Sequence, residues 1–177
     1  EAYLSQFYRE AKKPLEELPH ESDNLGIVVT ICNEEQLEEA LSFDKISCYH
    51  LNLANYAKKD WERLIHRITK AGKRVIISFP FCMPENWTFT CHDSIDYLIN
   101  SWEMLAYVRT FKLPGKCYLD SNMYVVNQHA WKTYQKLYKM DGFTCHQDAS
   151  IPVYEGGMRI VYGRIPMMIT KGCLNRT

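Results

Sequence analysis

The chain has 177 residues, of which 46% are hydrophobic and 24% are charged, and its formal net charge is zero. This composition is typical of one globular domain and argues against a disordered, collagen-like or coiled-coil chain. No apolar run approaches the ~18 residues of a membrane span, so we expect a soluble protein with no membrane contact. The charge is uneven, because residues 1–44 hold 11 acids and 3 bases whereas residues 45–177 hold 10 acids and 18 bases. Either the two parts neutralise each other in the fold, or the basic part meets an anionic ligand or an acidic neighbouring domain.

The seven cysteines are an odd number and include no close-spaced pair. A chain of this length needs no disulfide staples, so we expect reduced thiols and a cytoplasmic location. The chain begins at Glu1 rather than at a methionine and stops at Thr177 without a polar tail. We therefore expect it to be a fragment of a longer protein.

The first elements can be read directly along the chain. Residues 1–24 start as a polar helix and are then interrupted by prolines, which predicts a helical lead-in or linker before a single domain over residues 25–177. Residues 26–31 form a β-branched run that is typical of a strand buried on both faces. Asn33 follows in the position of a helix N-cap, with Gln36 three residues later in a capping-box pattern.

The alternation of strand and helix continues to the end of the chain. Further strands are predicted at residues 48–53, 74–79, 104–109, 117–120, 143–146, 159–162 and 166–170, and further helices at residues 58–71, 93–101 and 127–140. This pattern predicts an α/β fold with a mostly parallel sheet, TIM-barrel-like or an incomplete barrel, with an open doubly wound sheet as the alternative. A complete barrel usually needs ~250 residues, so this one would be compact.

In both architectures the chemistry lies at the carboxyl ends of the strands. Arg109 and Asp120 are predicted there, and in one shared cleft they would perform acid–base chemistry or clamp a carboxylate. The alternative is that Asp120 caps a turn and Arg109 extends into solvent. The other predicted strand-end residues are Asn52, Ser78, Asn122, His146, Asp148, Tyr162 and Thr170.

Cysteine and histidine provide the candidate metal ligands. The pairs at residues 91–92 and 145–146 are both Cys-His, but neighbouring residues of a strand point to opposite faces, so a shared zinc site is not favoured. Cys173 lies in a basic segment that favours a thiolate, which makes it a candidate nucleophile, an iron–sulfur ligand or an idle surface thiol. Because an iron–sulfur cluster generally needs four thiolates, this chain alone is expected to hold no cofactor.

Two segments carry a family resemblance. Residues 160–177, Ile-Val-Tyr-Gly-Arg-Ile-Pro-Met-Met-Ile-Thr-Lys-Gly-Cys-Leu-Asn-Arg-Thr, resemble a segment in longer members of the collagenase-like peptidase family, numbered 32 among peptidases of unknown catalytic type. Residues 120–127, Asp-Ser-Asn-Met-Tyr-Val-Val-Asn, are similar to that family's Asp...Asn...Asn segment. From the resemblance and the strand ends we expect Cys173 to be a metal ligand. The expected binding residues are Arg109, Asp120, Asn122, Asn127, Tyr162 and Arg164.

The resemblance implies a barrel-like module from the later part of a multi-domain cytoplasmic protein. Tyr124 stands where the family usually has its middle Asn, and residues 145–148 stand where a Ser and a Glu are expected. The first hypothesis is therefore a module of a collagenase-like peptidase acting on protein, noncatalytic in isolation. The alternatives are a module of an iron–sulfur protein that hydroxylates transfer or ribosomal RNA, and a structural domain that docks against other domains of the parent chain.

Overall fold

The computed structural model describes residues 25–90, 95–146 and 157–163. In chain order its elements are β1 (Ile27–Ile31), α2 (Glu34–Leu41), β2 (Ile46–Asn52), η1 (Leu53–Asn55), η2 (Lys58–Asp60), α3 (Trp61–Lys70), β3 (Arg74–Ser78), β4 (Ile95–Ile99), α4 (Trp102–Thr110), β5 (Cys117–Leu119), η3 (Ser121–Met123), α5 (Gln128–Tyr138), β6 (Gly142–Thr144) and β7 (Gly157–Met158). The predicted lead-in over residues 1–24 and the predicted strand over residues 166–170 lie outside the described residues.

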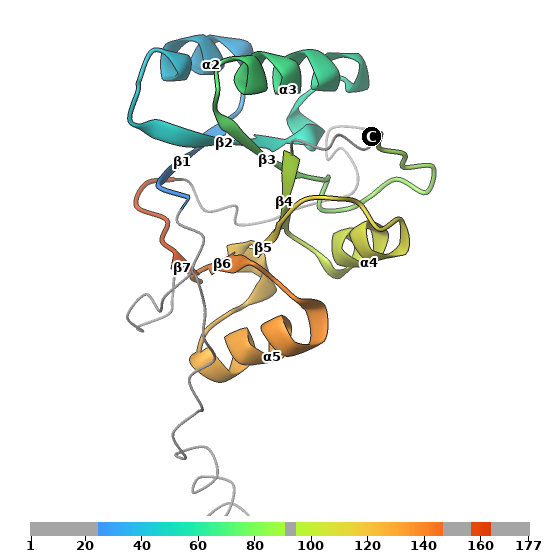
Figure 1. Ribbon diagram of the computed structural model, residues 1–177. Helices are drawn as coiled ribbons and strands as arrows, with labels where there is room; N and C mark the ends of the chain where they lie inside the picture. Colours follow the sequence, from blue (N-terminus) through green and yellow to red (C-terminus); the bar gives the residue numbers. More distant parts are fainter. Residues whose placement is uncertain (1–24, 91–94, 147–156, 164–177) are drawn as a thin grey trace, which may run out of the picture.

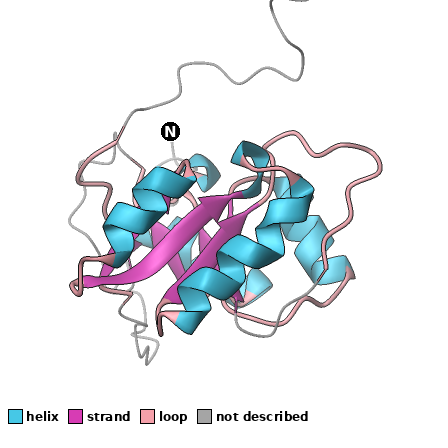
Figure 2. Cartoon of the chain, turned by 90° about the horizontal axis from the view of Figure 1, so that it is seen from above, coloured by secondary structure: helices cyan, strands magenta, loops and turns pink. Residues whose placement is uncertain are grey.

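The strands form one seven-stranded sheet in which each strand pairs in parallel with the next along the chain. The sheet curls, and the helices follow one another around its outer side, from α2 and α3 through α4 to α5 (Figure 1). Seen from above, the helices nearest the viewer run roughly along the strands that they cover (Figure 2). The prediction of an α/β fold with an incomplete parallel barrel is therefore confirmed. No helix among the described residues combines the length and apolar character of a membrane span.

The two faces of the curled sheet differ in burial. In β4 the side chains of Ile95, Tyr97 and Ile99 point outward and are fully buried under the helices, whereas Asp96 and Leu98 point inward and are only half-buried. The inward, concave face has a small apolar cluster of its own, made by Leu25, Cys48, Ile76 and Tyr118 with Val28, Leu98 and Met158 against it. Most of the core thus lies between the sheet and the helices, and the concave face carries the smaller cluster together with polar side chains.

Local sequence sets the starts of the helices. The side chains of Asn33, Ser101 and Asn127 accept hydrogen bonds from the backbone N–H groups three residues later, in the geometry of an N-cap. The predicted N-cap at Asn33 is confirmed. The Gln36 side chain turns back toward this cap, but it accepts a hydrogen bond from the backbone N–H of Cys32 rather than from that of Asn33.

The prediction for residues 93–109 is wrong, because strand and helix occur in the opposite order. Residues 95–99 form β4 and residues 102–110 form α4. The helical spacing that includes Leu98 and Trp102 misled the prediction, since Leu98 faces the concave side of the sheet and Trp102 is 58% exposed. Pairing with β3 and the N-cap at Ser101 determine the order instead.

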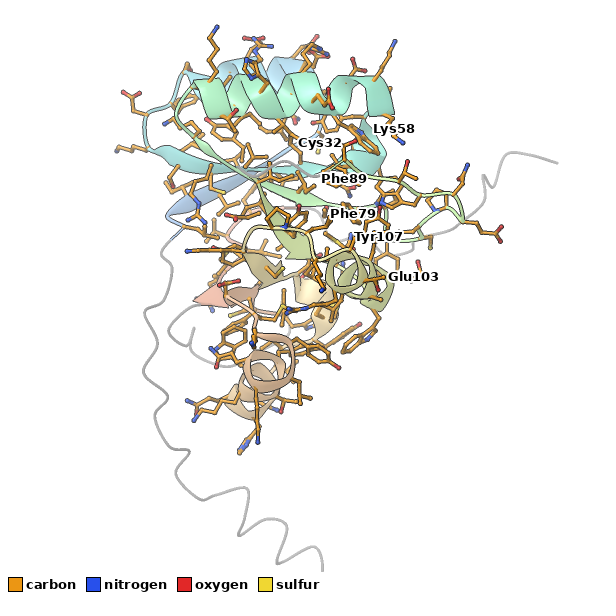
Figure 3. The ribbon with its side chains drawn as sticks, turned by 45° about the vertical axis from the view of Figure 1, so that its right-hand side comes forward. Cys32, Lys58, Phe79, Phe89, Glu103 and Tyr107 are labelled. Carbon is orange, nitrogen blue, oxygen red and sulfur yellow. The ribbon has the colours of Figure 1, made fainter. Side chains whose placement is uncertain are left out.

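The connection from β3 to β4 contains no helix among residues 79–90. Aromatic side chains pack there instead: the Phe79 ring lies 5.3 Å from those of Trp87 and Phe89 and 5.4 Å from that of Tyr107 on α4. Phe79, Phe89 and Tyr107 gather between α3 and α4, with Lys58 and Glu103 on either side (Figure 3). In place of a crossover helix, this aromatic cluster covers the outer face of β3 and β4.

The last strand is displaced from its prediction. We expected a strand over residues 159–162, but β7 comprises Gly157–Met158. Residues 159–162 are exposed and follow the strand, and Tyr162 is 97% exposed.

Candidate functional site

Polar side chains gather on the concave face at the carboxyl ends of the strands. The parallel register aligns Thr30 with His50 and Asn52 with Ser78, and continues from Ile99 and Leu119 to the next pair, Asn100 and Asp120. The polar residues that the alternation places on this face are Thr30, His50, Asn52, Ser78, Asn100, Asp120 and Thr144. We call them the carboxyl rim. They occupy the edge at which α/β barrels and open α/β sheets bind their ligands.

On the β1–β3 side of the rim, three side chains form a chain of hydrogen bonds. Thr30 Oγ1 lies 3.1 Å from Nδ1 of His50, and Ser78 Oγ lies 2.9 Å from Nε2 of the same ring. Burial lowers the pKa of His50 to about 4. A neutral imidazole has one donor and one acceptor, and two hydroxyls satisfy both in either tautomer.

This arrangement resembles a nucleophile with its base, but its environment opposes that chemistry. Ser78 is buried, and its hydroxyl is engaged by Nε2 of His50. A general base must accept a proton in the transition state, and the buried His50 resists the positive charge that follows. A threonine hydroxyl at Nδ1 gives the imidazolium no compensating negative charge. The Thr30–His50–Ser78 chain links the side chains of β1, β2 and β3 at the rim.

On the β4–β5 side, Asn100 and Asp120 are the central polar groups. Asn100 is buried, and its Nδ2 donates to the backbone carbonyl of Phe79 at 2.8 Å. The Asp120 carboxylate accepts from the backbone N–H and the hydroxyl of Ser121 and from Nδ2 of Asn122. Burial raises the pKa of Asp120, and these three hydrogen bonds oppose the rise. A partly desolvated carboxylate therefore lies at the centre of the rim.

Beyond β5 the rim ends in a pair of stacked rings. The ring of Tyr124 lies 4.7 Å from that of His146, with an angle of 21° between the two planes. Tyr124 has φ of 54°, in the left-handed region that non-glycine residues seldom adopt, and is 64% exposed. Its neighbours Met123 and Val125 are buried and hold this turn against the core. The result is an exposed aromatic surface beside the rim.

At the amino ends of the strands, on the opposite edge of the concave face, the charged side chains Arg74 and Asp96 pair with each other. Arg74 Nη2 donates to Asp96 Oδ2 at 2.7 Å and to the hydroxyl of Tyr118 at 3.0 Å. The other oxygen of Asp96 accepts from the backbone N–H of Lys116. These bonds tie β3, β4 and β5 together.

The structure does not bring Arg109 and Asp120 together. Arg109 is in the last turn of α4 rather than at the end of a strand, and its side chain is exposed. Burial raises the pKa of Cys117 to about 11, and the nearby charge of Arg109 opposes that rise. Arg109 is therefore near the first residue of β5, whereas Asp120 follows its last residue. The predicted cleft between them is wrong, because a helix that returns across a parallel sheet ends near the amino end of the next strand.

The other predicted residues have different environments. Asn122 holds the Asp120 carboxylate, and Asn127 uses its side chain to cap α5. Tyr162 is exposed beyond β7. Arg164 and Cys173 lie outside the described residues, so a metal-binding role for Cys173 stays a prediction.

Sequence reasoning missed four rim residues, Thr30, His50, Asn100 and Thr144. His50 is part of an apolar strand, and its partners are 20 and 28 residues away in the chain. Asn100 precedes a helix cap and has no spacing signal of its own. The alternation of β2 was the one usable signal, because it places His50 on the same face as Asn52.

The described residues include no group of three or more histidine, cysteine or acidic side chains placed to hold a metal ion. Residues 91–92, one of the two predicted Cys-His pairs, lie outside the described ranges. The chain matches no protein-family model, and neither a curated protein nor a solved structure shows significant similarity to it.

Proposed function

We propose that this chain is a noncatalytic module that binds peptide segments of a protein substrate at its carboxyl rim, within a larger protein like those of the collagenase-like peptidase family. The supporting observation is the nature of the rim. It presents hydrogen-bonding groups from neighbouring strands, while the imidazole of His50, which contacts the hydroxyls of Thr30 and Ser78, is buried and resists protonation. Such a surface binds and orients a polar ligand without supplying a nucleophile.

A peptide suits this surface because its main chain offers alternating donors and acceptors. Asn100 and Asp120 lie on the same face of the sheet as Thr30, an exposed residue of β1. In the larger protein the module would hold the substrate while another domain cleaves it. We further propose a reducing, cytoplasmic location, which the five free cysteines among the described residues support.

The test uses a fluorescein-labelled gelatin peptide and the 177-residue chain. Fluorescence anisotropy should show saturable binding, and electrophoresis should show no cleavage of gelatin or casein. Asp120→Ala should weaken binding at least ~10-fold, because it removes a charged hydrogen-bond acceptor. Glu62→Ala on the exposed surface of α3 is the matched control and should bind normally. Cleavage that disappears in Ser78→Ala would contradict the noncatalytic role, and absence of saturable binding would contradict the peptide-binding role.

A second candidate, binding of single-stranded RNA, is favoured by the stacked Tyr124 and His146 rings. Exposed aromatic rings stack on nucleobases, and Arg159, which follows the next strand, acts electrostatically on Cys145 beside His146. An oligouridine probe would distinguish the candidates: RNA binding should fall steeply with salt and with Tyr124→Ala. Peptide binding should be retained in that variant.

A further inference from the structure

The buried amide of Asn100 has an acceptor that no group among the described residues uses. Its Nδ2 donates to the Phe79 carbonyl, which can only accept, so this contact identifies the opposite end of the amide as the oxygen. That Oδ1 atom is buried and has no hydrogen-bond partner in the part of the chain that the structure describes. Asn100 as a whole is 6% exposed. Buried acceptors are nearly always paired, so this atom indicates a ligand group that donates.

The carboxylate beside it also has acceptor capacity left. Oδ1 of Asp120 accepts two bonds from Ser121, whereas Oδ2 accepts one bond, from Asn122 Nδ2 at 3.0 Å. A carboxylate oxygen has two lone pairs, so Oδ2 can accept one more bond. None of the ion pairs among the described residues involves Asp120. The negative charge is thus held by neutral donors alone.

The two acceptors are neighbours on one face. Asp120 donates its backbone N–H to the carbonyl of Ile99 at 2.8 Å, which places it beside Asn100 across the β4–β5 pair. Both continue the alternation of Leu98 and Tyr118, which belong to the concave cluster. Nδ2 of Asn100 is engaged by the carbonyl of Phe79, the residue that follows β3, so within the described ranges Oδ1 is the free end of this amide beside Asp120.

We propose that Asn100 and Asp120 form a binding site for a guanidinium group, the side chain of an arginine in the bound peptide. This inference rests on the proposed function, because it names the side chain that the peptide site recognises. A guanidinium carries five N–H donors in a planar fork and is weakly hydrated, so it can bond a carboxylate and an adjacent amide oxygen in a partly buried site. A hard metal ion would need more oxygen ligands than these two side chains offer.

The experiment is an NMR titration of the ¹⁵N-labelled chain with N-acetyl-arginine amide. N-acetyl-citrulline amide, which has the same shape without the charge, is the ligand control. Arginine should shift the side-chain amide signal of Asn100 and the backbone signal of Ser121, with an affinity at least ~10-fold above that of citrulline. Asp120→Asn should remove this preference while keeping the fold, since an amide retains the shape of the carboxyl. Asp44→Asn removes an equal charge at an exposed position before β2 and should have no effect.

Equal affinities for arginine and citrulline, or an unchanged preference in Asp120→Asn, would overturn the proposal. The side-chain amide signal of Asn100 distinguishes this site from a surface ion pair, because arginine that is held only by charge would not shift that signal. An unshifted Asn100 signal would therefore also overturn the proposal. The outcome is distinguishable from that of the gelatin experiment. If gelatin binds without an arginine preference, only the guanidinium site fails. If arginine binds as expected and gelatin does not, the site stands and the peptide-binding function fails.

Discussion

Acid should destabilise this protein through His50 in particular. Burial lowers the pKa of this side chain from 6.5 to about 4. The unfolded chain therefore takes up a proton as the pH falls through ~6.5, whereas the folded chain stays neutral until ~4. The stability that the neutral imidazole contributes is fully present above ~6.5, declines over this window, and is lost below ~4. Integrated over the window, the loss is about 3 kcal/mol, and between about pH 7.5 and about pH 5 it is about 2 kcal/mol.

Urea unfolding at these two pH values measures the effect, with His50→Gln as the comparison. Glutamine keeps a polar side chain between Thr30 and Ser78 but cannot titrate. The difference in unfolding free energy between the wild-type chain and His50→Gln should shrink by about 2 kcal/mol at the lower pH. Other titrating groups, including Asp120, cancel in this difference. His66→Gln on the exposed face of α3 is the control and should show no such change. A difference that is the same at both pH values would refute the buried, neutral His50.

Three further predictions concern stability and the rim. Phe79→Ala should cost ~3–5 kcal/mol in chemical unfolding because Phe79 is fully buried in the aromatic cluster, whereas Phe43→Ala, at a residue 54% exposed, should cost under ~0.5 kcal/mol; equal losses would show that the cluster is not core. Gly115→Ala should lower stability by over ~2 kcal/mol, since φ is 113° and the added Cβ would lie 2.2 Å from the Ile95 carbonyl oxygen. The Cβ added in Gly72→Ala has no atom within 4 Å, so this substitution should lower stability by only ~1 kcal/mol. A larger loss of stability in Gly72→Ala than in Gly115→Ala would contradict the close approach of Gly115 to Ile95. Arg109→Ala should leave binding of the gelatin peptide unchanged in the anisotropy assay, and a clear loss of affinity would place Arg109 at the rim after all.

Much of the fold could be predicted because its signals are local. The β-branched run of β1, the cap at Asn33 and the apolar face of α3 each depend on residues within a few positions of one another. The same local reasoning failed where two periods overlap. Residues 95–105 keep helical spacing, but the pairing of Ile77 with Tyr97 and the cap at Ser101 make the first part a strand. Contacts across the sheet, which the spacing does not encode, decided this segment.

The candidate site was predictable in part for the same reason. Asp120 and Asn122 follow a strand, and parallel topology places all such residues at one edge. Arg109 was misplaced because its element was misassigned. His50 and Asn100 gain their significance only from burial and from partners on other strands, such as Ser78 and Phe79. No pattern along the chain indicates that one acceptor of Asn100 remains unused.

Hydrogen–deuterium exchange of the chain with saturating gelatin peptide tests the central claim most directly, because it reports which end of the sheet the ligand covers. We predict slower exchange in residues 79–83, 100–104 and 120–124, which follow β3, β4 and β5. Residues 72–74 and 115–117 at the amino ends of β3 and β5 should exchange as in the free protein. Protection confined to the amino ends, or spread over the outer helices without the carboxyl rim, would contradict the account.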